Sequence, residues 1–145
     1  MIEIRNARKS YAAEVRIGPL NIDIPKAGIT SLIGPNGAGK STTLLMIGRL
    51  LNMDEGQIRV ANMDVRSTKS DDLAKILTIL RQENHFITRL TVRQLVGFGR
   101  FPHSKGRLTR EDEAIISKYI DFLELTELES RFLDELSGGQ RQRAY

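Results

Sequence analysis

Residues 34–42 read Gly-Pro-Asn-Gly-Ala-Gly-Lys-Ser-Thr and combine the residue types that bind a chain of phosphates. Glycine has no Cβ, so the backbone can adopt left-handed angles and come close to a ligand. Successive N–H groups can then point inward as an anion-binding nest at the positive end of the following helix. Lys40 adds a positive charge for the β- and γ-phosphates, and the Ser41 hydroxyl is suited to ligate Mg²⁺. The segment therefore predicts a site for a nucleoside triphosphate.

Two elements must position this loop, a buried strand before it and a helix after it. Residues 29–33 are mostly apolar and predict a short buried strand. Residues 40–51 carry apolar side chains at helical spacing and predict a helix with one buried face. An ordinary glycine-rich turn is the alternative, and this strand–loop–helix context argues against it.

The first half of the chain predicts strands, and the second half predicts helices. Alternating polar and apolar residues at 2–4, 15–24 and 57–60 indicate an antiparallel layer with one solvated face. A compact apolar run at 76–80 predicts a buried strand. The predicted helices are residues 40–51, 71–75, 91–97, 109–123 and 126–133, and residues 98–106 predict a loop because they are rich in helix breakers.

Helix caps are visible in the sequence of the second half. Thr91 is a plausible N-cap, and Thr109 with Asp112 forms an acidic capping pair before an apolar helical run. Thr91 and Thr109 each stand where a helix is predicted to begin.

Composition excludes several classes of protein. The 145 residues are 40% hydrophobic and 28% charged, which is typical of a globular domain. Aromatic residues make up 6% and the basic residues are scattered, so a nucleic-acid-binding surface is not predicted. There is no cysteine, which excludes disulfides and thiolate metal sites. No apolar run is long enough to span a bilayer, and no signal peptide is predicted.

Residues 136–140, Leu-Ser-Gly-Gly-Gln, form a second informative stretch. One interpretation is a capping box in which Ser137 caps a helix and Gln140 reaches back. That interpretation leaves Gly138 and Gly139 unexplained, since each is unfavourable in a helix by up to ~1 kcal/mol relative to alanine. Glycines are expected there if a ligand approaches the bare N–H groups of the helix N-terminus.

With both motifs in place, the chain resembles the ATP-binding subunit of an ABC transporter. Residues 34–42 match the Walker A motif of that family, and residues 136–140 match its LSGGQ signature without a substitution. Gln82 falls where the family has its Q-loop glutamine, and Tyr11 falls where the family has an aromatic residue that stacks on adenine. Tyr11 also fits a packed strand tyrosine, because tyrosine favours strands.

The resemblance implies a set of site residues. ATP would be bound by Tyr11, Gly34, Pro35, Asn36, Gly37, Ala38, Gly39, Lys40, Ser41, Thr42, Ser137, Gly138, Gly139 and Gln140. Ser41 and Gln82 would contact Mg²⁺, and Gln82 would also contact the attacking water and couple hydrolysis to transport.

The resemblance also implies a fold and partners. The fold would be an α/β P-loop NTPase of ABC type, in which an antiparallel β layer and a RecA-like core (1–82) precede a helical insert (83–135) and the signature helix (136–145). Two subunits would pair head to tail, so that each ATP lies between Walker A of one copy and the signature of the other. Membrane permease subunits would be the further partners, with a substrate-binding protein engaged indirectly and no nucleic acid.

The run from Phe98 through the signature looks closest to importers of ferric siderophores, a branch related to haem and cobalamin importers. This places the expected protein at the cytoplasmic face of the cell membrane as a peripheral subunit. The residues themselves do not select iron, so the cargo is an analogy.

The family's Walker B strand and catalytic glutamate have no match in the sequence. Tyr119-Ile-Asp121 is the nearest stretch, and it lies within a helical pattern. His85 and His103 precede the signature, so neither is the family's switch histidine, and no ligand role is predicted for them. We expect the C-terminal part of the core to be missing, an apolar edge to be exposed beside the phosphate loop, and the 145 residues alone to bind nucleotide weakly and hydrolyse none.

Two other functions fit the motifs. A soluble ABC-type ATPase acting on ribosomes or DNA shares both motifs, but it usually carries a different or larger insert after Gln82. A nucleotide-binding module without turnover is the other alternative.

Overall fold

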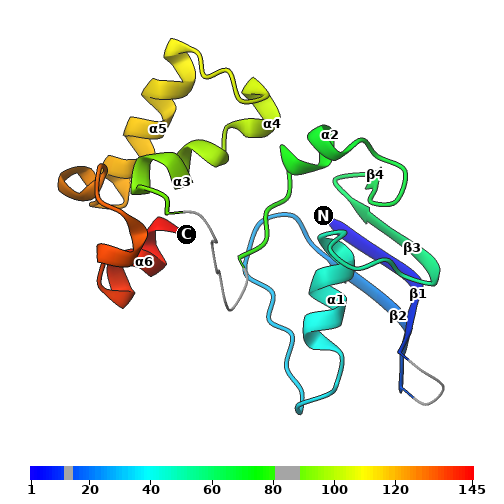
Figure 1. Cartoon of the computed structure of the whole chain (residues 1–145). Coiled ribbons are helices and arrows are strands. Elements are labelled where there is room, and N and C mark those ends of the chain that lie inside the picture. The colour runs from blue at the N-terminus through cyan, green and yellow to red at the C-terminus, as the bar shows by residue number, and fades with distance from the viewer. Residues whose placement is uncertain (12–14, 81–88) are drawn as a thin grey trace. The chain divides into compact units, whose positions relative to one another are not determined.

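The computed structural model describes residues 1–11, 15–80 and 89–145, and of Val15 only the backbone. The chain divides into two compact units, Met1–Ile79 and Leu80–Tyr145 (Figure 1). The predicted boundary at residue 82 lies outside the described residues, and the three-part division of the domain stays a prediction.

The first unit contains a four-stranded antiparallel sheet of order β2-β1-β3-β4. The antiparallel layer predicted from the alternation of polar and apolar residues is therefore confirmed. Its strands are β1 (Ile2–Tyr11), β2 (Val15–Ile24), β3 (Glu55–Val60) and β4 (Met63–Asp64).

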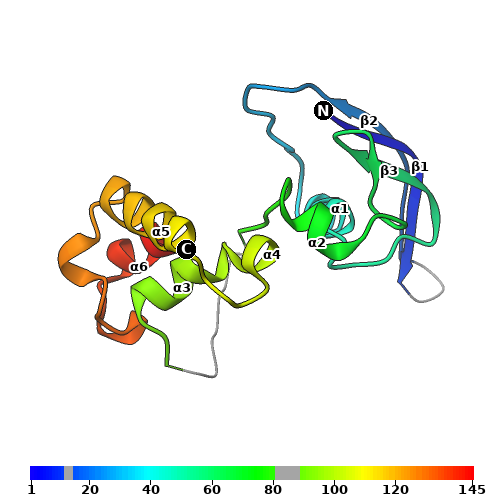
Figure 2. The same ribbon diagram turned by 90° about the horizontal axis from the view of Figure 1, so that it is seen from above.

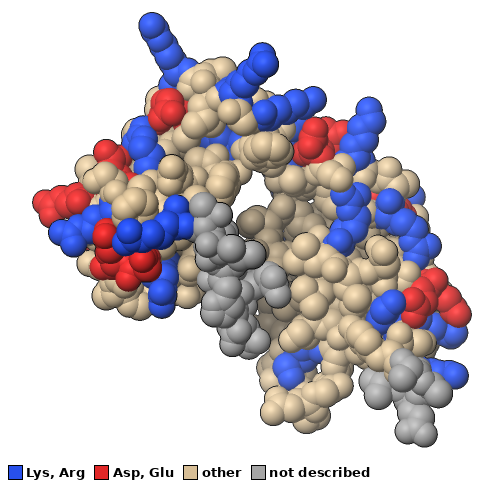
Figure 3. Space-filling model, viewed as in Figure 1, with Lys and Arg blue, Asp and Glu red and all other residues tan. Residues whose placement is uncertain are grey.

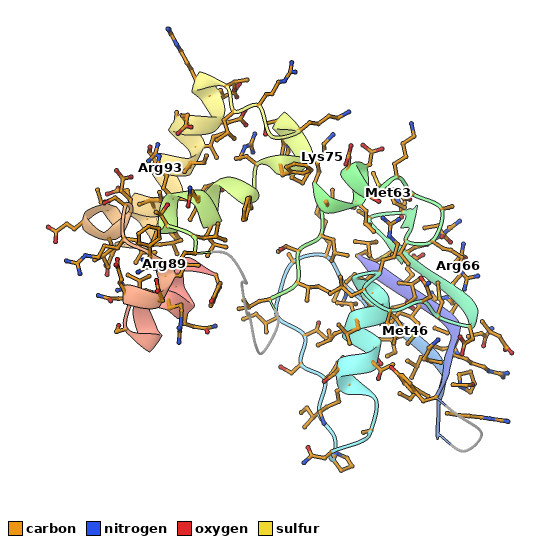
Figure 4. The ribbon with its side chains drawn as sticks, viewed as in Figure 1. Met46, Met63, Arg66, Lys75, Arg89 and Arg93 are labelled. Atoms are coloured by element: carbon orange, nitrogen blue, oxygen red, sulfur yellow. The ribbon has the colours of Figure 1, made fainter. Side chains whose placement is uncertain are left out.

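Helix α1 (Lys40–Ile47) lies against one face of this sheet, as Figures 1 and 2 show. Met46, labelled in Figure 4, is buried with Ile4 of β1 and Ile58 of β3. The short helix α2 (Ser70–Ala74) adds Leu73 to the same core. This packing attaches the N-terminus of α1, and so the loop before it, to the sheet.

Helix α1 is shorter than the predicted 40–51. It ends at Ile47 with Gly48 as its C-cap, and Arg49 then takes a left-handed φ of 54°. The Arg49 guanidinium donates hydrogen bonds to the carbonyl oxygens of Val65 and Thr68 at 3.2 and 2.6 Å. These contacts turn the chain away from the helix axis, so residues 48–51 do not extend α1.

The two predicted buried strands are wrong. Residues 29–33 and 76–80 are not strands; Ile29 and Ile33 are 99% and 92% exposed, and Ile76 and Leu80 are exposed as well. A strand forms only when a neighbour accepts its backbone hydrogen bonds, and the four described strands pair only with one another. The expected apolar exposure beside the phosphate loop is present, but on an unpaired segment rather than on a sheet edge.

The second unit is helical. It comprises α3 (Val92–Phe98), α4 (Phe101–Ser104), α5 (Arg110–Phe122), α6 (Gly138–Ala144) and two 3-10 turns, Thr126–Leu128 and Leu133–Glu135. Its core is made of Val92, Ile116, Ile120, Leu125, Leu133, Leu136 and Ala144.

Both predicted caps are confirmed, and two other predictions in this unit need correction. Thr91 and Thr109 each form a reciprocal capping box, with Gln94 and Asp112 respectively. The predicted loop at 98–106 contains α4, because Pro102 lies in the first helical turn, where its missing N–H is not needed. The helix predicted at 126–133 is wrong: the range contains the 3-10 turn Thr126–Leu128, and a second 3-10 turn, Leu133–Glu135, begins at its last residue.

Candidate functional site

The loop between residues 34 and 39 is shaped by two left-handed glycines. Gly37 and Gly39 have φ values of 82° and 85°, which side chains other than glycine rarely adopt. At Gly39 a Cβ would also lie 2.9 Å from Cγ2 of Ile17 on β2. Any other residue at position 39 would therefore be strained in its backbone and would force the Ile17 side chain to shift.

This geometry leaves free donors at the start of α1. Gly39 is the N-cap and supplies no side-chain hydrogen bond, and the first intrahelical bond runs from the Thr43 N–H to the Gly39 carbonyl at 2.8 Å. The N–H groups of residues 40–42 hydrogen-bond to no described residue. They face outward at the positive end of the helix dipole, which is an arrangement suited to an anion.

Lys40 supplies a charge without an acidic partner. Its Nζ donates hydrogen bonds to the carbonyl oxygens of Gly34 and Pro35, both at 2.8 Å, and forms no ion pair with a described carboxylate. The ammonium group is thus held across its own loop by neutral acceptors, which an anion can replace. Ser41 is exposed beside it on the first turn of α1.

Tyr11 lies at the end of β1, next to the same helical turn. Its hydroxyl is 3.4 Å from the Thr42 Oγ1, and the residue is 40% exposed. A half-exposed ring beside a phosphate-type loop can present one face to a flat base. The structure thus brings Tyr11 and residues 34–42 together within the first unit.

Asp54, which sequence reasoning did not single out, positions this end of β1. Its carboxylate accepts hydrogen bonds from the Lys9 Nζ and the Ser10 backbone N–H, both at 2.7 Å. The Lys9 hydrogen bond, reinforced by that of Ser10, lowers the pKa of Asp54. No sequence signal identifies this residue, since the contact depends on the register between β1 and the turn before β3.

The Ser-Gly-Gly-Gln motif begins α6 in the second unit. The capping box is present: Gln140 N–H donates to the Ser137 Oγ at 3.3 Å, and Ser137 N–H donates to the Gln140 Oε1 at 3.0 Å. A Cβ at Gly138 or Gly139 would meet nothing within 4 Å. The packing of the chain therefore does not require glycine at either position.

An ion-pair network supports the approach to α6. Arg89 pairs with Asp134 at 2.8 Å and with Glu135 at 3.2 Å, and it stacks 4.2 Å from the centre of the Phe132 ring (Figure 4). The hydrogen bond from Arg89 lowers the pKa of Asp134. Leu136 is buried in the core next to this network. Ser137 is thereby held at a defined position with the glycines exposed.

Some predicted residues are not tested by this geometry. Gln82 and His85 lie outside the described residues. His103 is exposed in α4, and no described group of three or more His, Cys, Asp or Glu residues could hold a metal ion.

The loop of residues 34–39 fits nucleotide and Mg²⁺ together. Magnesium on a nucleotide needs only one or two protein oxygens besides phosphate and water, and Ser41 offers one.

Comparison with known proteins gives concordant matches. A family model described as ABC transporter matches residues 17–145. The petrobactin import ATP-binding protein FatE of Bacillus anthracis is 81% identical over the whole chain, and the chain spans 58% of that relative. The iron(3+)-hydroxamate import ATP-binding protein FhuC of Bacillus subtilis (strain 168) is 41% identical over 93% of the chain and 51% of the relative.

A solved structure has a similar backbone. The dimeric post-hydrolysis state of the ATP-binding cassette MJ0796, bound to ADP and Pi, matches with a TM-score of 0.80 and 28% identity. The match covers 99% of this chain and 66% of that one. The chain therefore spans between half and two thirds of the length of these three proteins.

Proposed function

Because the chain belongs to the ABC transporter family, we propose that it is the ATP-binding part of an importer subunit for ferric siderophores. The observation that carries the proposal is the start of α1 after the loop of residues 34–39. The N–H groups of residues 40–42 bond to no described residue there, and the Lys40 ammonium is held only by carbonyl oxygens. Similarity to petrobactin and iron(3+)-hydroxamate import proteins supports the siderophore as cargo.

The residues of the first unit take separate roles in binding ATP. Lys40 exchanges its two carbonyl acceptors for phosphate oxygens, and the N–H groups of residues 40–42 donate to the same anion. Ser41 offers its hydroxyl to Mg²⁺, and Tyr11 offers its ring to the adenine. Gln82 contacts the metal and the attacking water in this proposal. In this proposal, hydrolysis of the bound nucleotide supplies the free energy for transport.

A second copy of the subunit completes the site. Ser137, Gly138 and Gly139 stand exposed at the N-terminus of α6 with room for an approaching group. In the proposed head-to-tail pair they donate to a phosphate held at the partner's Lys40. The dimeric state of the MJ0796 cassette supports the pairing of two copies.

Membrane permease subunits are the proposed partners of the second unit. A groove of about 510 Å³ lies between α3, α4 and α5. Its surface is mainly apolar, although Arg93 and Glu113 also line it, and the apolar side chains are Leu90, Phe98, Phe101, Leu108 and Ile116. Such a groove suits the apolar face of a helix from another subunit. No described helix is long and apolar enough to cross a membrane, so in this proposal the cargo crosses through the permease, served by a substrate-binding protein outside.

We also propose that the 145 residues by themselves bind nucleotide weakly and hydrolyse none. The sequence contains no apolar strand that ends in Asp-Glu, and Asp121 lies within α5. Hydrolysis by the family's mechanism needs such a glutamate to polarise water. Robust ATPase activity of the purified 145-residue chain, lost on Lys40→Ala substitution, would contradict this part of the proposal.

Co-purification tests the transport role. The tagged chain is expressed together with the membrane subunits of a siderophore importer, solubilised in detergent, and recovered with and without Mg-ATP. We expect those subunits to be recovered and nucleic acid to be absent. Recovery of ribosomes or DNA without membrane subunits would overturn the transport role in favour of a soluble ABC-type ATPase.

A further inference from the structure

A cluster of basic side chains without a described partner lies between the end of α4 and the first residue of α5. We call Lys105, Arg107 and Arg110 the basic turn. All three are exposed, and none forms an ion pair or a side-chain hydrogen bond with a described residue. Figure 3 shows Lys and Arg side chains projecting into solvent from this connection at the top of the second unit. The fold of the unit does not use these charges.

The backbone of the basic turn has a defined shape. Lys105 and Gly106 both take left-handed φ values, 51° and 83°. The Lys105 N–H donates to the Phe101 carbonyl at 2.8 Å, and the Arg107 N–H donates to the Ser104 carbonyl at 3.0 Å. A lysine is unfavourable in this conformation relative to glycine. The turn therefore presents its side chains outward from a fixed backbone.

Exposed apolar side chains are interleaved with the basic ones. Phe98, Phe101 and Leu108 are 54%, 57% and 43% exposed. The Phe101 ring lies 3.6 Å from the position that a Cβ of Gly106 would occupy, so it is in direct contact with the turn. Aromatic side chains beside exposed lysine and arginine are the combination that proteins use at membrane surfaces.

We propose that the basic turn contacts the anionic lipid headgroups of the membrane that holds the permease. The inference rests on the proposed docking of this unit on membrane subunits. None of the three basic residues lines the apolar groove, so they extend from its edge rather than into it. Side chains on an exposed turn suit an extended anionic surface better than a peptide seated in the groove. Each basic residue near such a surface strengthens binding by about fivefold, over a range of about one Debye length.

Vesicle binding tests the proposal. The 145-residue chain is mixed with vesicles of phosphatidylcholine alone or with phosphatidylglycerol added, and bound protein is measured by co-sedimentation. We expect binding only to the anionic vesicles, with a decrease as ionic strength is raised to about 0.15 M and beyond. Equal binding to both kinds of vesicle would overturn the proposal.

Charge reversal locates the contact. The variant Lys105→Glu/Arg107→Glu/Arg110→Glu should lose at least about tenfold in affinity for anionic vesicles. The control Arg16→Glu/Lys26→Glu/Lys69→Glu reverses three exposed charges of the first unit, and it should bind like the parent chain. Far-UV circular dichroism checks that both variants fold. An equal loss in both variants would show that net charge alone drives binding, and no loss in either would show that the turn is not involved; each result overturns the proposal.

Two further readouts separate this inference from the proposed function. The affinity for nucleotide at the Lys40 loop is measured on the same samples. If nucleotide does not bind, the proposed function fails, but the vesicle measurement still tests the lipid contact. Recovery of membrane subunits in detergent is the second readout. If the basic-turn variant loses those subunits but keeps its affinity for vesicles, the partner is an acidic protein segment and the lipid proposal is wrong.

Discussion

Two glycine-containing segments, each at the start of a helix, owe their glycines to different causes. In the loop before α1, Gly39 is required by the fold, since its φ is 85° and Ile17 lies against it. At the start of α6, Gly138 and Gly139 have open space around them. The first glycine is explained within the chain, whereas the second pair is explained only by a molecule that approaches from outside. The comparison therefore separates a loop whose glycine is constrained by the fold from a helix start whose glycines are not, and in the proposed function the second of these meets another subunit.

Substituting Gly39 should have the largest effect. Gly39→Ala forces a Cβ into a left-handed backbone and against Ile17, so we expect the first unit to lose about 2–4 kcal/mol of stability. Denaturant unfolding followed by circular dichroism measures the loss. Gly138→Ala is the matched control at the other helix start. If Gly39→Ala and Gly138→Ala had similar unfolding midpoints, the fold would not constrain Gly39 more than Gly138, which would contradict the comparison.

Acid should act on the helical unit through Asp112, the carboxylate in the cap of α5. The Thr109 backbone N–H, then the Thr109 hydroxyl and Arg100, lower the pKa of Asp112 from 3.8 to about 2. A lowered folded-state pKa contributes stability above the unfolded pKa, and that stability is lost as the pH falls from about 4 toward about 2.

Asp112→Asn tests this contribution. We expect a lower thermal midpoint than that of the parent chain at pH 7, with the difference shrinking as the pH falls through the same range. Glu111→Gln, on the same helical turn and without a described partner, is the control and should show neither change. A pH-independent difference for Asp112→Asn would mean that its charge has no part in the cap.

Substituting the signature glycines should have the smallest effect on stability. Gly138→Ala/Gly139→Ala improves helix propensity and meets no neighbouring atom, so we expect an unchanged fold or a gain of up to about 1 kcal/mol. ATP-dependent pairing of subunits, followed by light scattering in the complete transporter subunit, should nonetheless be lost. A clear loss of stability would mean that the chain itself needs these glycines.

Local features were the ones that the sequence predicted well. The capping pairs of Thr91, Thr109 and Ser137 involve residues three positions apart, so the sequence alone contains both partners. The alternation that predicted β1 and β2 is likewise local, because one face of an antiparallel pair is solvated.

Features that depend on distant partners were predicted poorly. Residues 29–33 have the composition of a buried strand, yet nothing in the described chain pairs with them, and Ile29 is almost fully exposed. Two contacts depend on strand register and could not be deduced from spacing. They are the contact of Tyr11 with Thr42 and the hydrogen bond from Lys9 of β1 to Asp54. The roles of the site residues, Gln82 among them, stay predictions.

Titration with Mg-ATP tests the central claim most directly. Isothermal calorimetry on the parent chain should give saturable binding. Lys40→Ala should weaken it by about 10- to 100-fold, as expected when a charged hydrogen bond is lost. Lys26→Ala, which removes an exposed lysine from the turn after β2, should leave the affinity unchanged. Equal affinity of the parent chain and Lys40→Ala would contradict the account, because the loop would then not be the nucleotide site.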